Sequence, residues 1–159
     1  MKTYTISFFG HRQISQPFLV ERELEKIVRE KLMKEEYVEF LVGRGGEFDL
    51  LAASVIRRTA QKLDYGNSAL VLVLHRMTAE YRDNRQSLLD YYDEVEICPE
   101  AEKAHFKGAI QIRNRSMVDR SELVVCCVEH ESGGAYQTVQ YAEQRKKQVV
   151  NVVDFFGNI

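Results

Sequence analysis

Three turns of this sequence combine glycine with charged or hydroxyl side chains, and each directly follows an apolar segment. They are Gly10-His11-Arg12, residues 43–49 and Ser132-Gly133-Gly134. Glycine lets backbone N–H groups approach a phosphate closely, and the N-terminus of a following helix favours negative charge. The three turns therefore predict a binding site for a phosphorylated, nucleotide-like ligand.

The turn at residues 43–49 does not match the standard phosphate-binding motifs. A Walker A loop needs Lys followed by Ser or Thr after its last glycine, and this sequence has Glu47-Phe48 there. The alternative is a tight turn that needs glycine only for a positive φ. Because Arg44 and Asp49 flank the glycines, we favour ligand contact over a purely structural turn.

The turn at Ser132 precedes a segment with helical spacing. Anion binding at the start of that helix and capping by the serine hydroxyl use different donors, so the two roles are compatible. Glu129 and Glu131 lie close by in the sequence. Their carboxylates would repel a phosphate, and they are better suited to a ribose hydroxyl, an adenine edge or a metal.

Histidine and arginine are neighbours after two apolar segments, in His11-Arg12 and His75-Arg76. Arginine matches phosphate geometry with a bidentate fork, and histidine can donate a hydrogen bond or relay a proton. A solvated rim is the alternative, and it explains His75-Arg76 equally well. A metal site would need His11, His75 and His130 to converge, which their spacing does not require. We therefore predict no metal and no cofactor.

The turns alternate with apolar segments of helical or strand character. Strands are expected at residues 3–9, 38–42, 69–74, 95–98, 123–128 and 148–153, and helices from residue 17, at 48–63, around 87–92, at 105–119 and at 134–146. This alternation predicts one α/β domain over residues 1–159, a Rossmann-like doubly wound sheet of about five to six mainly parallel strands with helices on both faces. The carboxyl ends of parallel strands meet at one edge of a sheet, so the glycine turns are expected together there.

The composition argues against several classes of function. The formal net charge of −2 gives no overall basic field, which argues against nucleic acid as a partner, although it allows a local basic patch. Cys98, Cys126 and Cys127 form no CxxC pair, so we predict buried thiols rather than a disulfide, a metal site or a nucleophile. No apolar run approaches the ~20 residues of a membrane span, and no signal-peptide pattern is present. We expect a cytoplasmic protein with no membrane partner.

The glycine turns, Arg113-Asn114 followed by Met117-Val118-Asp119, and Tyr141-Ala142 together resemble the SLOG superfamily. This group is named after Smf, the DNA-processing protein A, and LOG, the cytokinin-activating proteins. The resemblance covers nearly the whole chain and is closest to small stand-alone bacterial members of unknown function. It implies a Rossmann-like fold that binds a nucleotide or nucleotide-derived ligand. The candidate ligand-binding residues, from motifs and resemblance together, are Gly10, His11, Arg12, Gly43, Arg44, Gly45, Asp49, Arg113, Asn114, Ser132, Gly133 and Gly134.

One departure from the family concerns catalysis. The LOG branch carries PGGxGTxxE, and its glutamate is the acid/base group of nucleotide N-glycosidic hydrolysis. Gln140 stands at the position of that glutamate in this sequence. Glutamine cannot ionise, so the resemblance leaves enzymatic activity open and the catalytic residues unknown.

Three hypotheses follow for the function. The first is a nucleotide-binding module that acts as a sensor or carrier. The second is a phosphoribohydrolase that releases a base from a nucleoside monophosphate, with Glu47, Glu129 or Glu131 replacing the missing glutamate. The third is binding of single-stranded DNA as in the Smf branch, which would need a basic groove. The resemblance to LOG proteins also makes a homodimer a candidate assembly, and residues 76–93 are a candidate lid.

Overall fold

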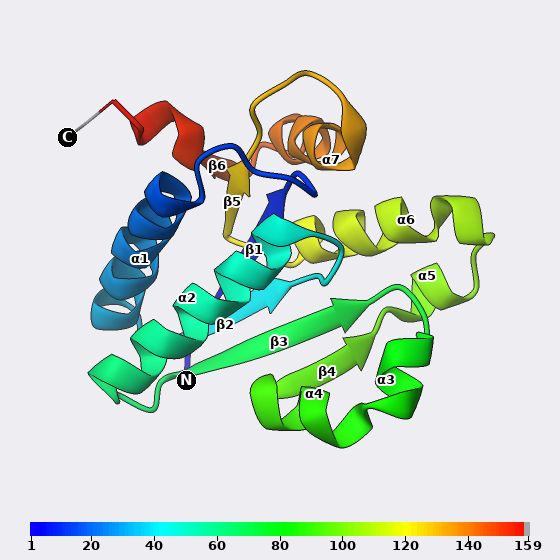
Figure 1. The fold of residues 1–159 in the computed structure, drawn as a ribbon, viewed down its shortest axis with the longest axis horizontal. Coiled ribbons are helices and arrows are strands. Elements are labelled where there is room, and N and C mark those ends of the chain that lie inside the picture. The colour runs from blue at the N-terminus through cyan, green and yellow to red at the C-terminus, as the bar shows by residue number, and fades with distance from the viewer. Residues whose placement is uncertain (158–159) are drawn as a thin grey trace.

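Six parallel strands form a single sheet in the order β4-β3-β2-β1-β5-β6 (Figure 1). The structure is a computed structural model that describes residues 1–157, so the last two residues of the predicted domain lie outside the described range. The strands are β1 (Thr3–Gly10), β2 (Tyr37–Val42), β3 (Ser68–Leu74), β4 (Glu94–Ile97), β5 (Leu123–Cys127) and β6 (Gln148–Asn151). Every neighbouring pair is parallel, which confirms the predicted Rossmann-like α/β fold.

Helices cover both faces of this sheet (Figure 1). They are α1 (Pro17–Lys34), α2 (Glu47–Leu63), α3 (Ala79–Asp83), α4 (Arg85–Tyr91), α5 (Pro99–Glu102), α6 (Phe106–Asp119) and α7 (Gly133–Gln144), with a 3-10 helix η1 (Val152–Phe155) after β6. One apolar core lies between the sheet and α1, α2 and α4, and a second lies beneath α5, α6 and α7. Leu72 of β3 faces the first core, while Val71 and Val73 face the second. The continuous apolar run of β3 is therefore explained by burial on both faces.

The order of the strands places the topological switch point between β1 and β5. Strands β1 to β4 follow one another toward one side of the sheet, and β5 and β6 extend it on the other side. Ligands of doubly wound sheets bind outside the carboxyl ends of the strands at such a point. The glycine turns after β1, β2 and β5 all lie at this edge of the sheet.

Three parts of the fold differ from the sequence prediction. A short helix, α5, lies between β4 and α6, where none was expected. The last strand ends at Asn151, not at Val153. The Asn151 side chain accepts hydrogen bonds from the N–H groups of Val128 at 3.2 Å and Val153 at 3.4 Å, and so turns the chain into η1. Residues 76–93 contain two short helices where one was expected, because Thr78 caps the start of α3 by accepting from the N–H of Tyr81.

None of the helices within residues 1–157 has the length and apolar character needed to cross a lipid bilayer.

Candidate functional site

A cleft of about 800 Å³ opens at the carboxyl edge of the sheet, at the switch point. Its walls come from the turns after β1, β2, β3 and β5, from α6 and from the first residues of α7. Eleven of the twelve residues predicted from the sequence line it: Gly10, His11, Arg12, Arg44, Gly45, Asp49, Arg113, Asn114, Ser132, Gly133 and Gly134. Gly43 is absent from the lining. Residues that the prediction did not include also line it, among them Gln13, Gly46, Thr78, Glu80 and Ile110.

Two glycines let the end of β1 and the start of α2 approach closely. A methyl group on Gly10 would lie 2.6 Å from Cβ of Phe48, and one on Gly46 would lie 2.5 Å from Cα of Arg12. The Glu47 N–H also donates to the Arg12 carbonyl at 2.8 Å. Within residues 43–49 no φ is positive, so the interpretation as a turn that needs positive φ is wrong. These glycines are required by close backbone packing.

Arg113 is held at the base of the cleft by its neighbour Asn114. The Asn114 Oδ1 accepts from Nε and Nη2 of Arg113 at 3.2 and 2.8 Å, and Nη1 of Arg113 donates to the Val73 carbonyl at 3.4 Å. The Asn114 amide also donates to the Thr138 hydroxyl at 3.0 Å, which donates to the Gly134 carbonyl at 2.8 Å. Asn114 is buried and bonded through both ends of its side chain, so it links Arg113 of α6 to the first turn of α7.

Asp49 lies near Arg113 across a gap that Gly43 leaves open. A methyl group on Gly43 would lie 3.1 Å from Oδ2 of Asp49 and 3.2 Å from Nη1 of Arg113. The same Asp49 oxygen accepts from the Gly45 N–H at 2.8 Å. Burial raises the pKa of Asp49, while the Gly45 N–H and Arg113 act in the opposite direction. Burial lowers the pKa of Arg113, and the charge of Asp49 opposes this shift. Gly43 therefore shapes the base of the cleft without lining it.

Arg44 lines the cleft, but its charge is already compensated. Its Nε pairs with Glu80 at 2.8 Å, and its Nη1 donates to the Tyr92 hydroxyl at 2.8 Å. The hydrogen bond to Glu80 raises the pKa of Arg44 most strongly. Arg44 thus attaches the turn after β2 to the segment that contains α3 and α4.

Two features of the cleft that attract anions have no partner among residues 1–157. Ser132 occupies the N-cap position of α7, but its side chain accepts no capping hydrogen bond, so serine capping is not observed. Gly133 follows with a φ of 91°, a conformation that favours glycine. Arg12 is exposed, and within residues 1–157 its guanidinium makes no hydrogen bond or ion pair. The open helix start and the free guanidinium therefore line the same cleft.

Two histidines of the cleft, His11 and His130, stack on each other. His11 is buried, its Nε2 accepts from the Glu129 N–H at 3.0 Å, and its ring stacks on His130 with centroids 3.8 Å apart. The pKa of His11 is lowered mainly by burial and then by His130. The pKa of His75 is lowered mainly by burial, and then by Arg113 and Arg76. Among the described residues, the only group of side chains that lie close enough together to hold a metal ion is Glu39, Glu94 and Glu96, which contains no histidine.

The glutamates considered for hydrolysis do not line the cleft. Glu47, Glu129 and Glu131 are all absent from the described lining, and Glu129 accepts a hydrogen bond from the Ser15 hydroxyl. Gln140 also lies outside it and donates to the Tyr136 hydroxyl at 3.0 Å. Asp49 and Glu80 are the carboxylates of the described lining. Burial raises the pKa of both Cys126 and Cys127 to about 12, consistent with the predicted unreactive thiols.

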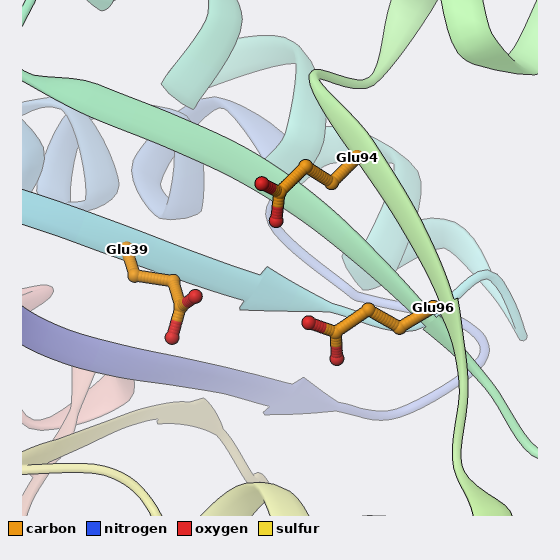
Figure 2. Close-up of side chains that lie close together, drawn as sticks. All are labelled: Glu39, Glu94 and Glu96. Atoms are coloured by element: carbon orange, nitrogen blue, oxygen red, sulfur yellow. The ribbon is translucent and has the colours of Figure 1, made fainter.

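A separate acidic cluster consists of Glu39 on β2 and Glu94 and Glu96 on β4. The three side chains project toward one another, with ligand oxygens within 4.8 Å (Figure 2). Arg120, directly after α6, pairs with Glu96 at 2.8 Å and with Glu39 at 3.2 Å. Because Arg120 already bridges two of these three carboxylates, we assign the cluster a structural role.

Comparisons with known proteins identify the fold. No protein-family model matches the sequence, and no curated protein matches it. DNA processing protein A from Streptococcus pneumoniae is similar in structure, with a TM-score of 0.64 and 17% identity over 92% of this chain and 49% of that chain. DNA processing protein A from Helicobacter pylori, whose structure describes its binding of single-stranded DNA, is also similar to this chain. The TM-score is 0.60 and the identity 14%, over 98% of this chain and 79% of that chain. This chain thus spans about half of the first protein. These similarities show that the chain shares its Rossmann-like fold with DNA processing protein A, which agrees with the fold that the SLOG resemblance implies.

The prediction that nucleic acid is not a partner is corrected by this comparison. The Helicobacter pylori protein shares the fold and binds single-stranded DNA. A net charge of −2 does not exclude a nucleic-acid site, because net charge averages over the whole surface. Arg12 and Arg113 line the cleft, whereas the acidic cluster lies outside its lining.

Proposed function

We propose that the cleft binds the phosphate group of a nucleotide unit, presented as a free nucleotide or within a single strand of nucleic acid. The observation that carries the proposal is the start of α7, where Gly133 and Gly134 leave backbone N–H groups uncapped in the same cleft as Arg12. A helix N-terminus carries partial positive charge and free donors, and arginine supplies a full charge with a planar fork. Both features match a phosphate.

The neighbouring side chains suit the rest of a nucleotide. Arg113 is a second cation whose orientation is fixed by Asn114. Asp49 accepts from Gly45 through one oxygen, which leaves the carboxyl group able to accept from a sugar hydroxyl or a base amino group. Asn114 acts in this proposal through Arg113 and not by direct contact.

The test is a binding titration of wild-type protein with a fluorescent oligo-dT and with a panel of mononucleotides, dinucleotides and cyclic nucleotides. Arg12→Ala should weaken binding of the ligand that is found by roughly tenfold or more, since a hydrogen bond to a charged group contributes about 1.5–3 kcal/mol. Arg58→Ala is the matched control, because Arg58 lies on α2 outside the cleft and pairs with Glu21. The proposal is contradicted if no ligand binds, or if both variants bind like the wild type.

The salt dependence of the titration separates the two sources of the phosphate. A single strand that contacts several phosphates releases counterions, with a slope of about −0.7 per phosphate in a plot of log K against log salt. A free mononucleotide should show a much smaller slope. Binding of either ligand supports the phosphate site. The slope then shows whether the bound phosphate belongs to a single strand or to a free mononucleotide.

A further inference from the structure

An exposed aromatic ring lies at the outer end of α6, beyond the part of this helix that lines the cleft. Phe106, the first residue of α6, is 67% exposed. Ile110, four residues later, lines the cleft and is 42% exposed. Residues four apart share a face of a helix, so Phe106 lies one turn beyond the cleft on the same face. Figure 1 shows that this end of α6 projects away from the sheet.

His105 holds the Phe106 ring from one side. His105 is the N-cap of α6, and its Nδ1 accepts from the Lys107 N–H at 3.3 Å. Its ring stacks on the Phe106 ring, with centroids 4.7 Å apart and an angle of 29° between the planes. Because the imidazole is fixed by its capping bond, the exposed ring has a defined support.

Positive charge accompanies this aromatic pair. Lys103 and Lys107 are exposed, and within the described residues their amino groups make no ion pair or hydrogen bond. Glu100 and Glu102 of α5 lie close to Lys103 in the sequence, whereas Lys107 lies on α6 directly after Phe106. Proteins that bind single strands combine cations that follow the backbone with aromatic rings on which bases stack.

We propose that Phe106, supported by His105, is a stacking platform for the nucleobase next to the nucleotide whose phosphate occupies the cleft. The ligand is then a single strand of at least two nucleotides, whose backbone passes Lys107. This inference rests on the proposed function, because the cleft must hold the first phosphate. A mononucleotide bound in the cleft would not reach the platform.

The experiment uses the absence of tryptophan from the chain. Phe106→Trp introduces a single indole, and base stacking should quench its fluorescence when oligo-dT is added but not when a mononucleotide is added. Phe18→Trp is the matched control, because Phe18 is an 88% exposed phenylalanine in the first turn of α1, over the other face of the sheet. Its fluorescence should remain unchanged.

A second variant measures the energetic contribution of the ring. Phe106→Ala should weaken oligo-dT binding by roughly tenfold, since stacking contributes about 1–3 kcal/mol per base, and should leave mononucleotide binding unchanged. Both substitutions are at an exposed position, and a melting temperature equal to that of the wild type verifies folding. If Arg12→Ala weakens oligo-dT binding while the Phe106 variants show neither quenching nor loss of affinity, the platform is refuted and the cleft stands. If the wild type binds no nucleotide or oligo-dT, both proposals fail together.

Discussion

The acidic cluster and the cleft are both charged regions of the same sheet, and they differ in how their charges are satisfied. In the cluster, Arg120 pairs with Glu39 and Glu96, so two of the three carboxylates have a cation of the protein as their partner. In the cleft, Arg44 is paired with Glu80, but Arg12 and the start of α7 have no partner among the described residues. Unsatisfied donors, and not the number of charged side chains, therefore distinguish the candidate site from the acidic cluster.

The cleft depends on close backbone packing, and Gly10→Ala should have the largest effect on it. The added methyl group would lie 2.6 Å from Cβ of Phe48, which is itself fully buried, so the free energy of unfolding should fall by about 3 kcal/mol. Gly45→Ala is the control, since its methyl group would meet only Asp49 Oδ2 at 3.6 Å. Urea denaturation of the two variants measures the difference. Equal stability of both would contradict the packing described for β1 and α2.

The hydrogen bonds behind Arg113 should contribute the next largest effect. Asn114→Ala leaves the buried Thr138 hydroxyl without its donor and Arg113 with only the Val73 carbonyl as acceptor, so unfolding should become easier by about 2 kcal/mol. Ligand affinity should fall as well, because the guanidinium is no longer fixed. Arg115→Ala is the control, because Arg115 is an exposed α6 residue outside the cleft, stacked over Tyr141 at 5.2 Å. If Asn114→Ala lowered stability but not affinity, Asn114 would have only a structural role.

Removal of Arg120 from the acidic cluster should lower the stability of the protein without changing its ligand affinity. Arg120→Ala leaves three carboxylates facing one another, and stability should fall by about 1 kcal/mol. Adding Glu96→Gln should recover part of this loss, because one of the repelling charges is removed. Chemical denaturation at low and high salt measures both variants, with a smaller loss expected at high salt. A change in ligand affinity would show that the acidic cluster and the cleft are coupled, and would contradict their description as separate regions.

The smallest expected effect is a pH dependence from the histidines of the cleft. The pKa values of His11 and His75 are lowered from 6.5 in the folded protein, mainly by burial. Between the folded and unfolded pKa values the unfolded chain binds more protons, so stability should fall as the pH falls below about 6.5. His11→Asn, which keeps an acceptor for the Glu129 N–H, should flatten this dependence. A melting temperature that rises on acidification through this range would contradict the assignment.

The fold and most of the cleft lining were predictable from local sequence signals. Each glycine turn follows an apolar strand, and parallel strands bring their carboxyl ends to one edge, so Gly10, Gly45 and Gly133 were expected together. Their individual roles were less predictable. Gly10 is required by contact with Phe48, and that contact depends on how β1 and α2 pack in three dimensions.

The remaining features depend on contacts between distant segments. Arg44, a predicted ligand-binding residue, lines the cleft and also pairs with Glu80, 36 positions away in the sequence. A sequence pattern does not indicate such a pairing. The sequence does not single out Phe106, because a single phenylalanine in a helical segment is usually part of a core. Its exposure is visible only in the folded structure.

The most direct test of the phosphate site is a set of ¹⁵N-HSQC spectra recorded during titration with a nucleotide and with oligo-dT. The account predicts that the largest amide shifts occur at Gly133, Gly134 and Ala135, since their N–H groups begin α7 and would donate to the phosphate. The Arg12 side chain should shift with them. Shifts that are absent from these groups and concentrated elsewhere on the surface would contradict the account.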